Sequence, residues 1–301
     1  MGPRPIDLHL AGLRDLGAEI CESGGRIEAT ARKLKGRRLV LGFPSVGATE
    51  NLMLAACAAE GVTTIENAAQ EPEIEDLQNF LNSCGGKITG GGTSTVQIIG
   101  GAEFHGGMWH IMPDRIAAAT YLCACACAGG DVYLPDARER DLAAVTEILR
   151  RAGCSVEEDG AGIRCTRQGI LMAVPAVRTA PYPGFPTDAQ AVVMAALTKG
   201  RGTTVFEENM FENRYRHVGE LRRLGADIRV SGRAAVVSGV ERLTGAGVSA
   251  ADLRGGAALC VAALGADGLS RVSEITHIDR GYEDIARDLR ALGARIIRKE
   301  E

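Results

Sequence analysis

The stretch LRDLGAEI, residues 13–20, recurs four more times along the chain. In every copy a glycine follows the second apolar position of a pattern whose apolar residues are spaced by three and four. Such a glycine ends an amphipathic helix in the left-handed conformation, and a strand is expected directly after it. The later copies are LNSCGGKI (81–88), LRRAGCSV (149–156), LRRLGADI (221–228) and LRALGARI (289–296).

The repeat period is 68 to 72 residues, because the glycines fall at positions 17, 85, 153, 225 and 293. An alanine-rich apolar helix precedes each of the last four copies, at residues 50–61, 116–130, 187–200 and 255–268. A β-type run such as VTTIEN (62–67) or TTVFEE (203–208) follows it, and two short strands joined by turn residues come after the glycine. With a leading strand in LVLGF (39–43), the sequence predicts a repeated βαβαββ unit.

A period near 70 residues is longer than the roughly 20 to 50 residues typical of solenoids. The alanine-rich helices are apolar all round, which favours burial on every side. We therefore expect an α/β fold in which three units close into a pseudo-threefold, inside-out domain, with these helices in the centre and the sheets outside. A chain of 301 residues also exceeds the size at which one core usually gives way to two, roughly 250 to 300 residues.

The predicted domains are residues 1–109, with one and a half units, and residues 110–301, with three. Only 16 residues precede Gly17, whereas 67 separate it from Gly85, so the first unit begins in its middle. Two sets of three units would need six. We expect the chain to represent the larger part of a six-unit protein, with its first domain incomplete and less stable than the second.

Composition excludes several classes of function. The net charge is -4 with both signs mixed along the chain, which gives no basic face for nucleic acid and no polybasic membrane anchor. The longest apolar run, residues 116–128, is too short to span a bilayer. The nine cysteines are odd in number and lie mostly in apolar segments, which indicates a reduced, cytoplasmic protein. No metal site is expected at Cys123, Cys125 and Cys127, because on a helix the middle thiol points away from the outer two.

Several segments, in order along the chain, closely resemble the UDP-N-acetylglucosamine enolpyruvyl transferase (1-carboxyvinyltransferase) family. This resemblance implies two domains of three units with substrates bound between them. It also implies transfer of the enolpyruvyl group of phosphoenolpyruvate to the 3-hydroxyl of UDP-N-acetylglucosamine, with release of phosphate and without cofactor. That reaction is the first committed step of peptidoglycan synthesis, and hence of cell-wall growth, cell shape and division. The segments are GPRPIDLHL (2–10), PSVGATEN (44–51), VRTAPYPGFPTDAQA (177–191), FENRYRHVGEL (211–221), ADLR (251–254) and HIDRGYE (277–283).

Asp188 is the candidate catalytic base. Thr187 and Gln190 have the spacing of a capping box, which places Asp188 in the first turn of a helix. By pattern alone, an acidic residue there complements the helix dipole. The resemblance implies more, because the aspartate of the family's PTD motif accepts the proton of the sugar hydroxyl and holds the sugar. A carboxylate within hydrogen-bond reach is what such a deprotonation needs.

Arginines are the candidate anion ligands. Arg4 and Arg280 both lie 13 residues before a repeat glycine, at equivalent strand-to-helix junctions, and helix N-termini favour anions. A guanidinium binds phosphate or carboxylate bidentately, although a single arginine is more often a surface residue. The resemblance assigns Arg4 to the nucleotide and phosphate region, Arg280 to phosphoenolpyruvate, and Asp252 with Arg254 to the same cleft.

The first domain is expected to hold most of the nucleotide sugar. The resemblance places the uracil at Pro5, Ile6, Asp7 and Leu8, and the diphosphate at Ser45, Val46 and Gly47. It makes Met210 an apolar contact to the nucleotide, and Arg214 belongs to the expected substrate-binding set. By charge pattern alone, however, the FENRYRHVGELRR segment around Arg214 is most simply a solvated helix face.

The family's reactive cysteine lies on a mobile loop just before the arginine that matches Arg4, and no cysteine of this sequence occupies that position. We therefore expect the 301 residues alone to show no appreciable transfer. A non-catalytic nucleotide-sugar-binding paralogue, or a regulatory fragment, is the alternative. The related 5-enolpyruvylshikimate 3-phosphate synthase is disfavoured by the nucleotide-type PRPIDL and PTDAQ segments. The oligomeric state stays open.

Overall fold

The computed structural model describes residues 5–299 and divides into two compact units. The first extends to Met112 and includes Pro181–Pro183, and the second comprises Pro113–Ala180 and the residues from Gly184 onward. The sequence places the boundary after residue 109, three residues earlier. That each unit folds as an independent domain stays a prediction.

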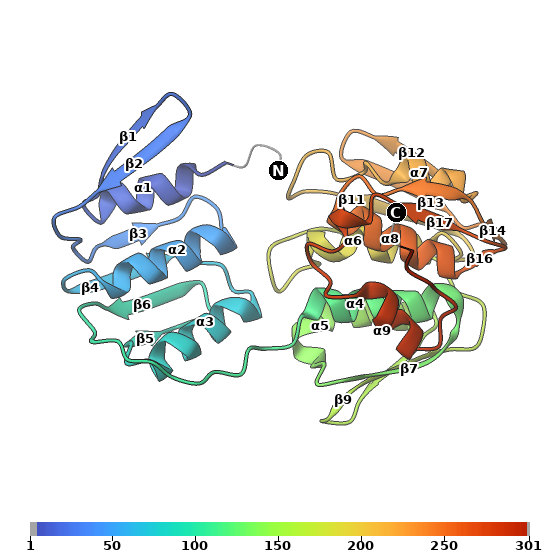
Figure 1. Ribbon diagram of the computed structural model, residues 1–301, viewed down its shortest axis with the longest axis horizontal. Coiled ribbons are helices and arrows are strands. Elements are labelled where there is room, and N and C mark those ends of the chain that lie inside the picture. Colours follow the sequence, from blue (N-terminus) through green and yellow to red (C-terminus); the bar gives the residue numbers. More distant parts are fainter. Residues whose placement is uncertain (1–4, 300–301) are drawn as a thin grey trace. The chain divides into compact units, whose positions relative to one another are not determined.

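The first unit contains a β-hairpin and one complete βαβαββ unit (Figure 1). In its four-stranded sheet, of order β3-β4-β6-β5, β3 and β4 are parallel and the other pairs are antiparallel. The predicted order of elements is therefore confirmed here. The elements are α1 (Asp7–Asp15), β1 (Glu19–Ser23), β2 (Arg26–Thr30), β3 (Arg38–Val40), α2 (Val46–Cys57), β4 (Val62–Glu66), α3 (Pro72–Ser83), β5 (Ile88–Thr89) and β6 (Thr95–Ile99).

The second unit repeats this plan, and its sheet β10-β11-β13-β12 has the same order and directions as the sheet of the first. A three-stranded sheet β7-β9-β8 and two short parallel pairs, β14-β16 and β15-β17, complete it. Its elements are α4 (Arg115–Ala128), β7 (Gly130–Pro135), α5 (Glu139–Arg151), β8 (Ser155–Glu158), β9 (Gly162–Arg167), β10 (Ala176–Arg178), α6 (Thr187–Leu197), β11 (Thr203–Glu207), α7 (Val218–Arg223), β12 (Asp227–Ser231), β13 (Ala234–Ser238), β14 (Leu243–Thr244), β15 (Gly247–Ser249), α8 (Leu253–Leu264), β16 (Ala266–Asp267), β17 (Arg271–Ser273), η1 (Ile275–His277) and α9 (Ile285–Ala291).

The five repeat glycines all adopt the left-handed conformation predicted for them. Their φ angles lie between +95° and +103°, a region that residues with a side chain rarely enter. A strand follows each of the first four, as expected. The prediction of a strand after Gly293 is wrong, because residues 294–299 are irregular. The described residues after Gly293 also contain no second strand with which such a strand could form a hairpin.

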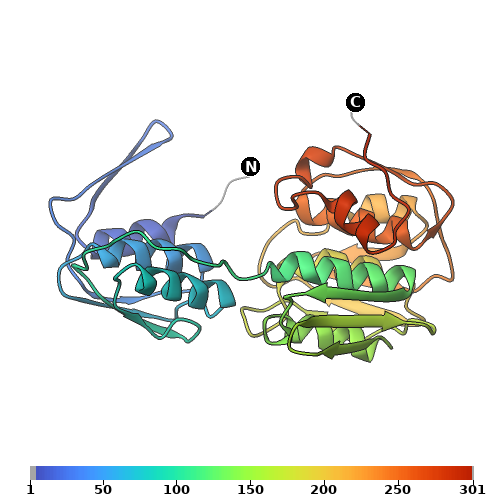
Figure 2. The ribbon, with the colours of Figure 1, turned by 60° about the horizontal axis from the view of Figure 1, so that its bottom comes forward.

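Three helices, α4, α6 and α8, pack against one another in the centre of the second unit. Their alanines and glycines bring the backbones close: a Cβ added to Gly265, the C-cap residue of α8, would lie 2.5 Å from Sγ of Cys127 in α4. The sheets lie outside, and Figure 2 shows α4 alongside the strands β7 and β9. The predicted arrangement of buried helices and outer sheets is therefore confirmed for this unit.

The cysteines serve this packing, as the sequence indicates. All nine are free thiols, and every one except Cys21 is buried. On α4, Cys125 Sγ donates to the carbonyl oxygen of Cys165, while Cys127 Sγ faces Ala195 of α6. Neighbouring thiols thus face different elements. Residues 5–299 contain no group of three potential metal ligands, and no helix in that range has the length and apolarity to cross a membrane.

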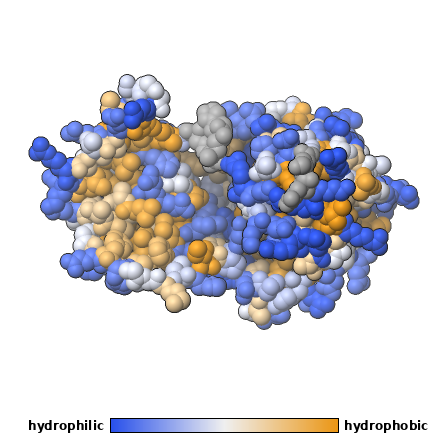
Figure 3. Space-filling view, viewed as in Figure 1, coloured by the Kyte–Doolittle hydropathy of each residue, from blue (hydrophilic) through white to orange (hydrophobic). Residues whose placement is uncertain are grey.

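The matching helix of the first unit, α2, is buried on one side alone. Leu52 and Met53 are fully buried, whereas the side chain of Leu54 is 51% exposed. Figure 3 shows a broad hydrophobic area over this part of the first unit. The core cluster of the first unit is also much smaller than that of the second. Less apolar area is therefore withdrawn from water per residue in the first unit.

We expect the first unit to be the less stable one. In native-state hydrogen exchange, the amides of α2 should lose protection at lower denaturant concentration than those of α4, α6 and α8, because locally less stable regions open first. Exchange followed by mass spectrometry on the monomeric chain measures this. Uniform protection of the four helices would contradict the prediction.

Candidate active site

Asp188 lies in the first turn of α6, as predicted, but the capping box does not form. Pro186 is the N-cap residue, and no side chain caps this end of the helix. The Thr187 hydroxyl and the Gln190 amide instead donate to the carboxylate of Glu208, at 2.9 and 3.1 Å. The reason is the position of the helix start: the N-cap is Pro186, and Thr187 is already the first helical residue, so Thr187 and Gln190 do not occupy the N-cap and N3 positions that a capping box requires.

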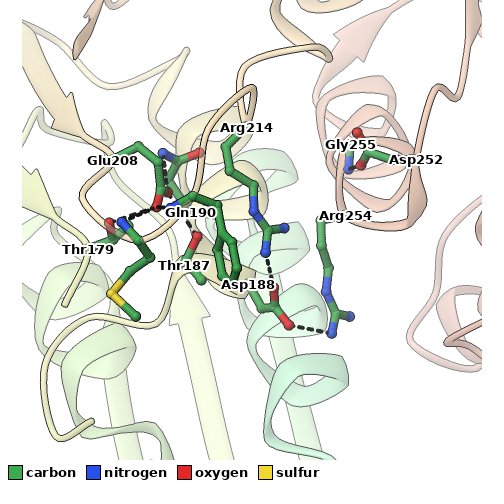
Figure 4. A network of polar contacts seen from close by, with 11 residues as sticks. Thr179, Thr187, Asp188, Gln190, Glu208, Arg214, Asp252, Arg254 and Gly255 are labelled. Atoms are coloured by element: carbon green, nitrogen blue, oxygen red, sulfur yellow. Dashed lines mark hydrogen bonds and ion pairs between the residues drawn. The ribbon is translucent and has the colours of Figure 1, made fainter. Parts of the chain in front are cut away.

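Two guanidinium groups hold the Asp188 carboxylate, one at each oxygen (Figure 4). Arg214 Nη2 lies 3.0 Å from Oδ1, and Arg254 Nη2 lies 2.8 Å from Oδ2. All three side chains are partly exposed, Arg254 to 20%, Arg214 to 26% and Asp188 to 37%. Burial raises the pKa of Asp188, but the charges and hydrogen bonds of Arg254 and Arg214 outweigh it and lower the pKa below its usual value. The carboxylate is therefore ionised at neutral pH.

Arg254 is placed by the start of α8. Asp252 is the N-cap residue of that helix, and its Oδ1 accepts the N–H of Gly255 at 2.7 Å. The cap fixes the first turn, from which Arg254 extends to Asp188 in the neighbouring helix. Tyr282 lies close to Arg254, and its hydroxyl contacts the Thr120 hydroxyl of α4 at 2.7 Å. Asp252 thus acts on the helix end and not directly on Asp188.

Arg214 comes from an irregular segment, and the helix face predicted for it is wrong. Helix α7 begins only at Val218, Arg214 lies in the turn that precedes it, and Asn213, with a φ of +57°, cannot belong to a right-handed helix. The guanidinium carbon of Arg214 lies 4.7 Å from the centre of the Phe211 ring, a cation–π contact. The ring and the Asp188 carboxylate together hold the Arg214 side chain.

Glu208 is a site residue that the sequence analysis missed. Its side chain is 1% exposed, and it follows β11 directly. A signal was available, since Thr204 and Phe206 of this strand are buried and the period of two places Glu208 on the same inward side. The charged pair Glu207–Glu208 concealed that alternation.

The remaining predicted residues lie elsewhere. Arg280 is exposed in the turn before α9, and no ion pair joins it to Asp188 among the described residues. Arg4 lies outside the described residues. In the first unit, the Ser45 hydroxyl caps α2 by accepting the N–H of Ala48, at 3.4 Å. Pro5 and Ile6 precede α1, Asp7 and Leu8 begin it, Val46 and Gly47 begin α2, and Met210 follows Glu208.

Comparison with known proteins first shows the class of protein to which this fold belongs. Residues 1–289 match the family model described as EPSP synthase (3-phosphoshikimate 1-carboxyvinyltransferase). The enolpyruvyl transferase NikO of Streptomyces tendae superimposes with a TM-score of 0.86 at 24% identity, covering 97% of this chain and 72% of that one. EPSP synthase of Acinetobacter baumannii gives 0.75 at 19% identity, covering 98% and 72%. The chain has the enolpyruvyl transferase fold.

Sequence relatives define the family. UDP-N-acetylglucosamine 1-carboxyvinyltransferase 1 of Caldanaerobacter subterraneus is 50% identical over 99% of this chain and 72% of its own length. The enzyme of that name from Nitratidesulfovibrio vulgaris strain DP4 is 49% identical over 100% and 72%. The chain belongs to the UDP-N-acetylglucosamine 1-carboxyvinyltransferase family, as its motifs indicate.

The Asp188 ion pairs predict a pH-dependent contribution to stability. Because folding lowers the pKa of Asp188, the stabilisation is complete above the unfolded-state value of about 3.9 and is lost as the pH falls through the folded-state value. Asp188→Asn should lower the free energy of unfolding at pH 7 by about 1 kcal/mol, the upper range for ion pairs partly screened by solvent. Its difference from the unsubstituted chain should shrink below pH 4.

Denaturant unfolding between pH 3 and 7 measures this difference. Asp227→Asn, an exposed aspartate in β12, is the matched control and should change stability little at any pH. If the free energy of unfolding of Asp188→Asn differs from that of the unsubstituted chain by the same amount at pH 3 and at pH 7, the ion pairs do not stabilise the fold.

Proposed function

We propose that this chain transfers the enolpyruvyl group of phosphoenolpyruvate to the 3-hydroxyl of UDP-N-acetylglucosamine, releasing phosphate, in the first committed step of peptidoglycan synthesis. The observation that carries the proposal is the Asp188 carboxylate, held at the start of α6 between the guanidiniums of Arg214 and Arg254. This arrangement offers one proton acceptor and two anion ligands in direct contact. The reaction needs both, because a hydroxyl must lose its proton beside an anionic co-substrate.

Asp188 is the proposed base. As the sugar oxygen bonds to the phosphate-bearing carbon of phosphoenolpyruvate, its proton passes to the Asp188 carboxylate, and the electrons of the carbon–carbon double bond take up a proton at the methylene carbon. The resulting methyl group then loses a proton, the double bond forms again, and phosphate leaves with the electrons of its carbon–oxygen bond. Arg254, and with it Arg280, would bind the negative charges of phosphoenolpyruvate, where fixed cations act most strongly in a site shielded from water. Asp252 would support Arg254 through the α8 cap.

The ion pairs also provide a way to couple deprotonation to substrate binding. While two cations hold its pKa low, Asp188 is a weak base. An anionic substrate that takes hydrogen bonds from Arg214 or Arg254 weakens their pull on the carboxylate and raises its proton affinity. Asp188 would thus become an effective base when phosphoenolpyruvate is present.

The other predicted roles belong to the same proposal. Arg4, residues 5–8, residues 45–47 and Met210 would each contact part of the nucleotide. We also propose that the protein acts in the cytoplasm and, through peptidoglycan, in cell shape and division. The free thiols support a reducing compartment, because extracellular proteins commonly pair their cysteines.

Phosphate release from phosphoenolpyruvate and UDP-N-acetylglucosamine tests the proposal. We would assay the 301-residue chain and a joined chain that carries, ahead of Gly2, the N-terminal segment of the Caldanaerobacter enzyme. The joined chain should release phosphate, the shorter one should release no appreciable amount, and Asp188→Ala in the joined chain should cost about 10²- to 10⁴-fold in kcat. Asp227→Ala is the matched control with unchanged activity.

One result would contradict the predicted need for the added segment, and two others would count against the assignment itself. Equal rates for the two chains would show that the added segment is dispensable. A joined chain that binds UDP-N-acetylglucosamine in calorimetry without releasing phosphate would be a nucleotide-sugar-binding paralogue. Turnover with shikimate 3-phosphate and not with UDP-N-acetylglucosamine would make the chain a 5-enolpyruvylshikimate 3-phosphate synthase, which shares the fold.

A further inference from the structure

Glu208 accepts hydrogen bonds from five donors (Figure 4). Its carboxylate is buried, and its two oxygens divide the donors between them. Oε1 accepts from the Thr179 hydroxyl and from the backbone N–H groups of Met210 and Phe211, at 3.1, 2.9 and 3.0 Å. Oε2 accepts from the Thr187 hydroxyl and the Gln190 amide, at 2.9 and 3.1 Å.

All five donors are neutral groups. Burying a carboxylate is costly unless hydrogen bonds replace its water, and here the chain supplies a nearly full set. An apolar side chain at this position would avoid the cost altogether if the position served packing alone. The reason for a buried carboxylate at this position therefore lies in the segments that it connects.

The carboxylate connects two segments that meet again at Asp188. On one side, Thr187 and Gln190 flank Asp188 in the first turn of α6. On the other, the N–H groups of Met210 and Phe211 begin the segment that delivers Arg214. Arg214 then closes a ring of contacts by pairing with Asp188 and stacking on Phe211.

A third bond ties this ring to the sheet. The Thr179 hydroxyl, which donates to Glu208, also accepts the N–H of Asn209 at 2.8 Å. Thr179 directly follows β10, so the segment after β11 is anchored to the end of the neighbouring strand. The backbone of Met210 and Phe211 therefore cannot move away from the first turn of α6 without breaking bonds to Glu208.

We propose that Glu208 is a positioning residue for the enolpyruvyl transfer. By joining the first turn of α6 to residues 209–214, it fixes the position of Arg214 relative to Asp188. This inference rests on the proposed function of Asp188. It adds a residue that touches neither substrate and acts through the base and one of its two counter-ions. Misplacement of a reacting group by about 1 Å costs on the order of 10²-fold in rate.

Two substitutions separate hydrogen bonding from packing. Glu208→Met fills the space without polar atoms and leaves five donors unpaired. Glu208→Gln keeps an oxygen for the two backbone N–H groups, and its amide group can donate to the Thr187 hydroxyl and to a reoriented Gln190. Glu208→Gln should therefore restore most of what Glu208→Met loses. Glu207→Gln is the matched control, because Glu207 pairs with Arg178 outside this ring.

The first measurement is the titration of Asp188 in the 301-residue chain. Carboxyl carbon NMR of chains labelled at aspartate follows it, with Asp188→Asn identifying the signal. In Glu208→Met the pKa of Asp188 should rise towards its ordinary value, because Arg214 no longer sits at a fixed distance. In Glu208→Gln and Glu207→Gln it should stay where it is. An unchanged titration in a folded Glu208→Met chain would overturn the proposal.

This titration does not depend on turnover, so failure of the proposed reaction and failure of the Glu208 inference are distinguishable. Kinetics of the joined chain provide the second measurement. Glu208→Met should lower kcat by about 10²-fold and move the acidic limb of the kcat/KM pH profile upward. A purely structural role would lower the rate by one factor at every pH and leave the limb in place, which would overturn the proposal.

Glu208→Met is a severe change, and a second variant covers the case in which it fails to fold. Thr187→Val removes one donor to Oε2 while keeping shape and volume. It should shift the Asp188 titration in the same direction by a smaller amount. No shift in Thr187→Val, together with impaired Glu208→Gln, would count against hydrogen bonding as the cause.

Discussion

The close packing of α6 against α8 is the constraint on which the site depends. Asp188 and Arg254 are separated by 66 residues, yet each lies in the first turn of its helix, and the two turns are neighbours because the helices are. Small side chains make this approach possible. With larger residues along the contact, the two helices would stand further apart and the guanidinium would no longer reach the carboxylate.

At the start of α6, contacts within the site replace the local capping interaction that the sequence favours. Thr187 and Gln190 have the chemistry to cap their own helix, and they bond to Glu208 instead. The helix begins without a side-chain cap, which ordinarily costs about 1 kcal/mol. Polar groups that break a local rule in this way are expected where function sets the geometry.

Much of the fold follows from the sequence, because its signals are local. The glycine after each amphipathic pattern, the alanine-rich helices and the paired short strands depend on near neighbours in the chain, and the structure has them where they were predicted, except for the strand expected after Gly293. Asp188 in the first turn of α6 belongs to the same category. The domain limits and the roles of Arg4 and Arg280 remain predictions.

The contacts that make the site do not follow from local pattern. Arg214 reaches Asp188 from an irregular segment in which Asn213 adopts a left-handed conformation, and no periodicity reveals this segment. The partnership of Glu208 with five donors joins segments from residue 179 to residue 211. The family resemblance supplied Asp188, Arg214 and Arg254 but not Glu208, and only the three-dimensional arrangement supplied the partners of all four residues.

The alanine-rich centre of the second unit also has an entropic side. Alanine and glycine lose no rotamer freedom on burial, so ordering α4, α6 and α8 carries little side-chain entropy cost. The alanine and glycine positions also cannot readjust around a disturbance by changing side-chain conformation. Any readjustment in the centre is left to the larger buried side chains, such as Leu122, Met194 and Leu259.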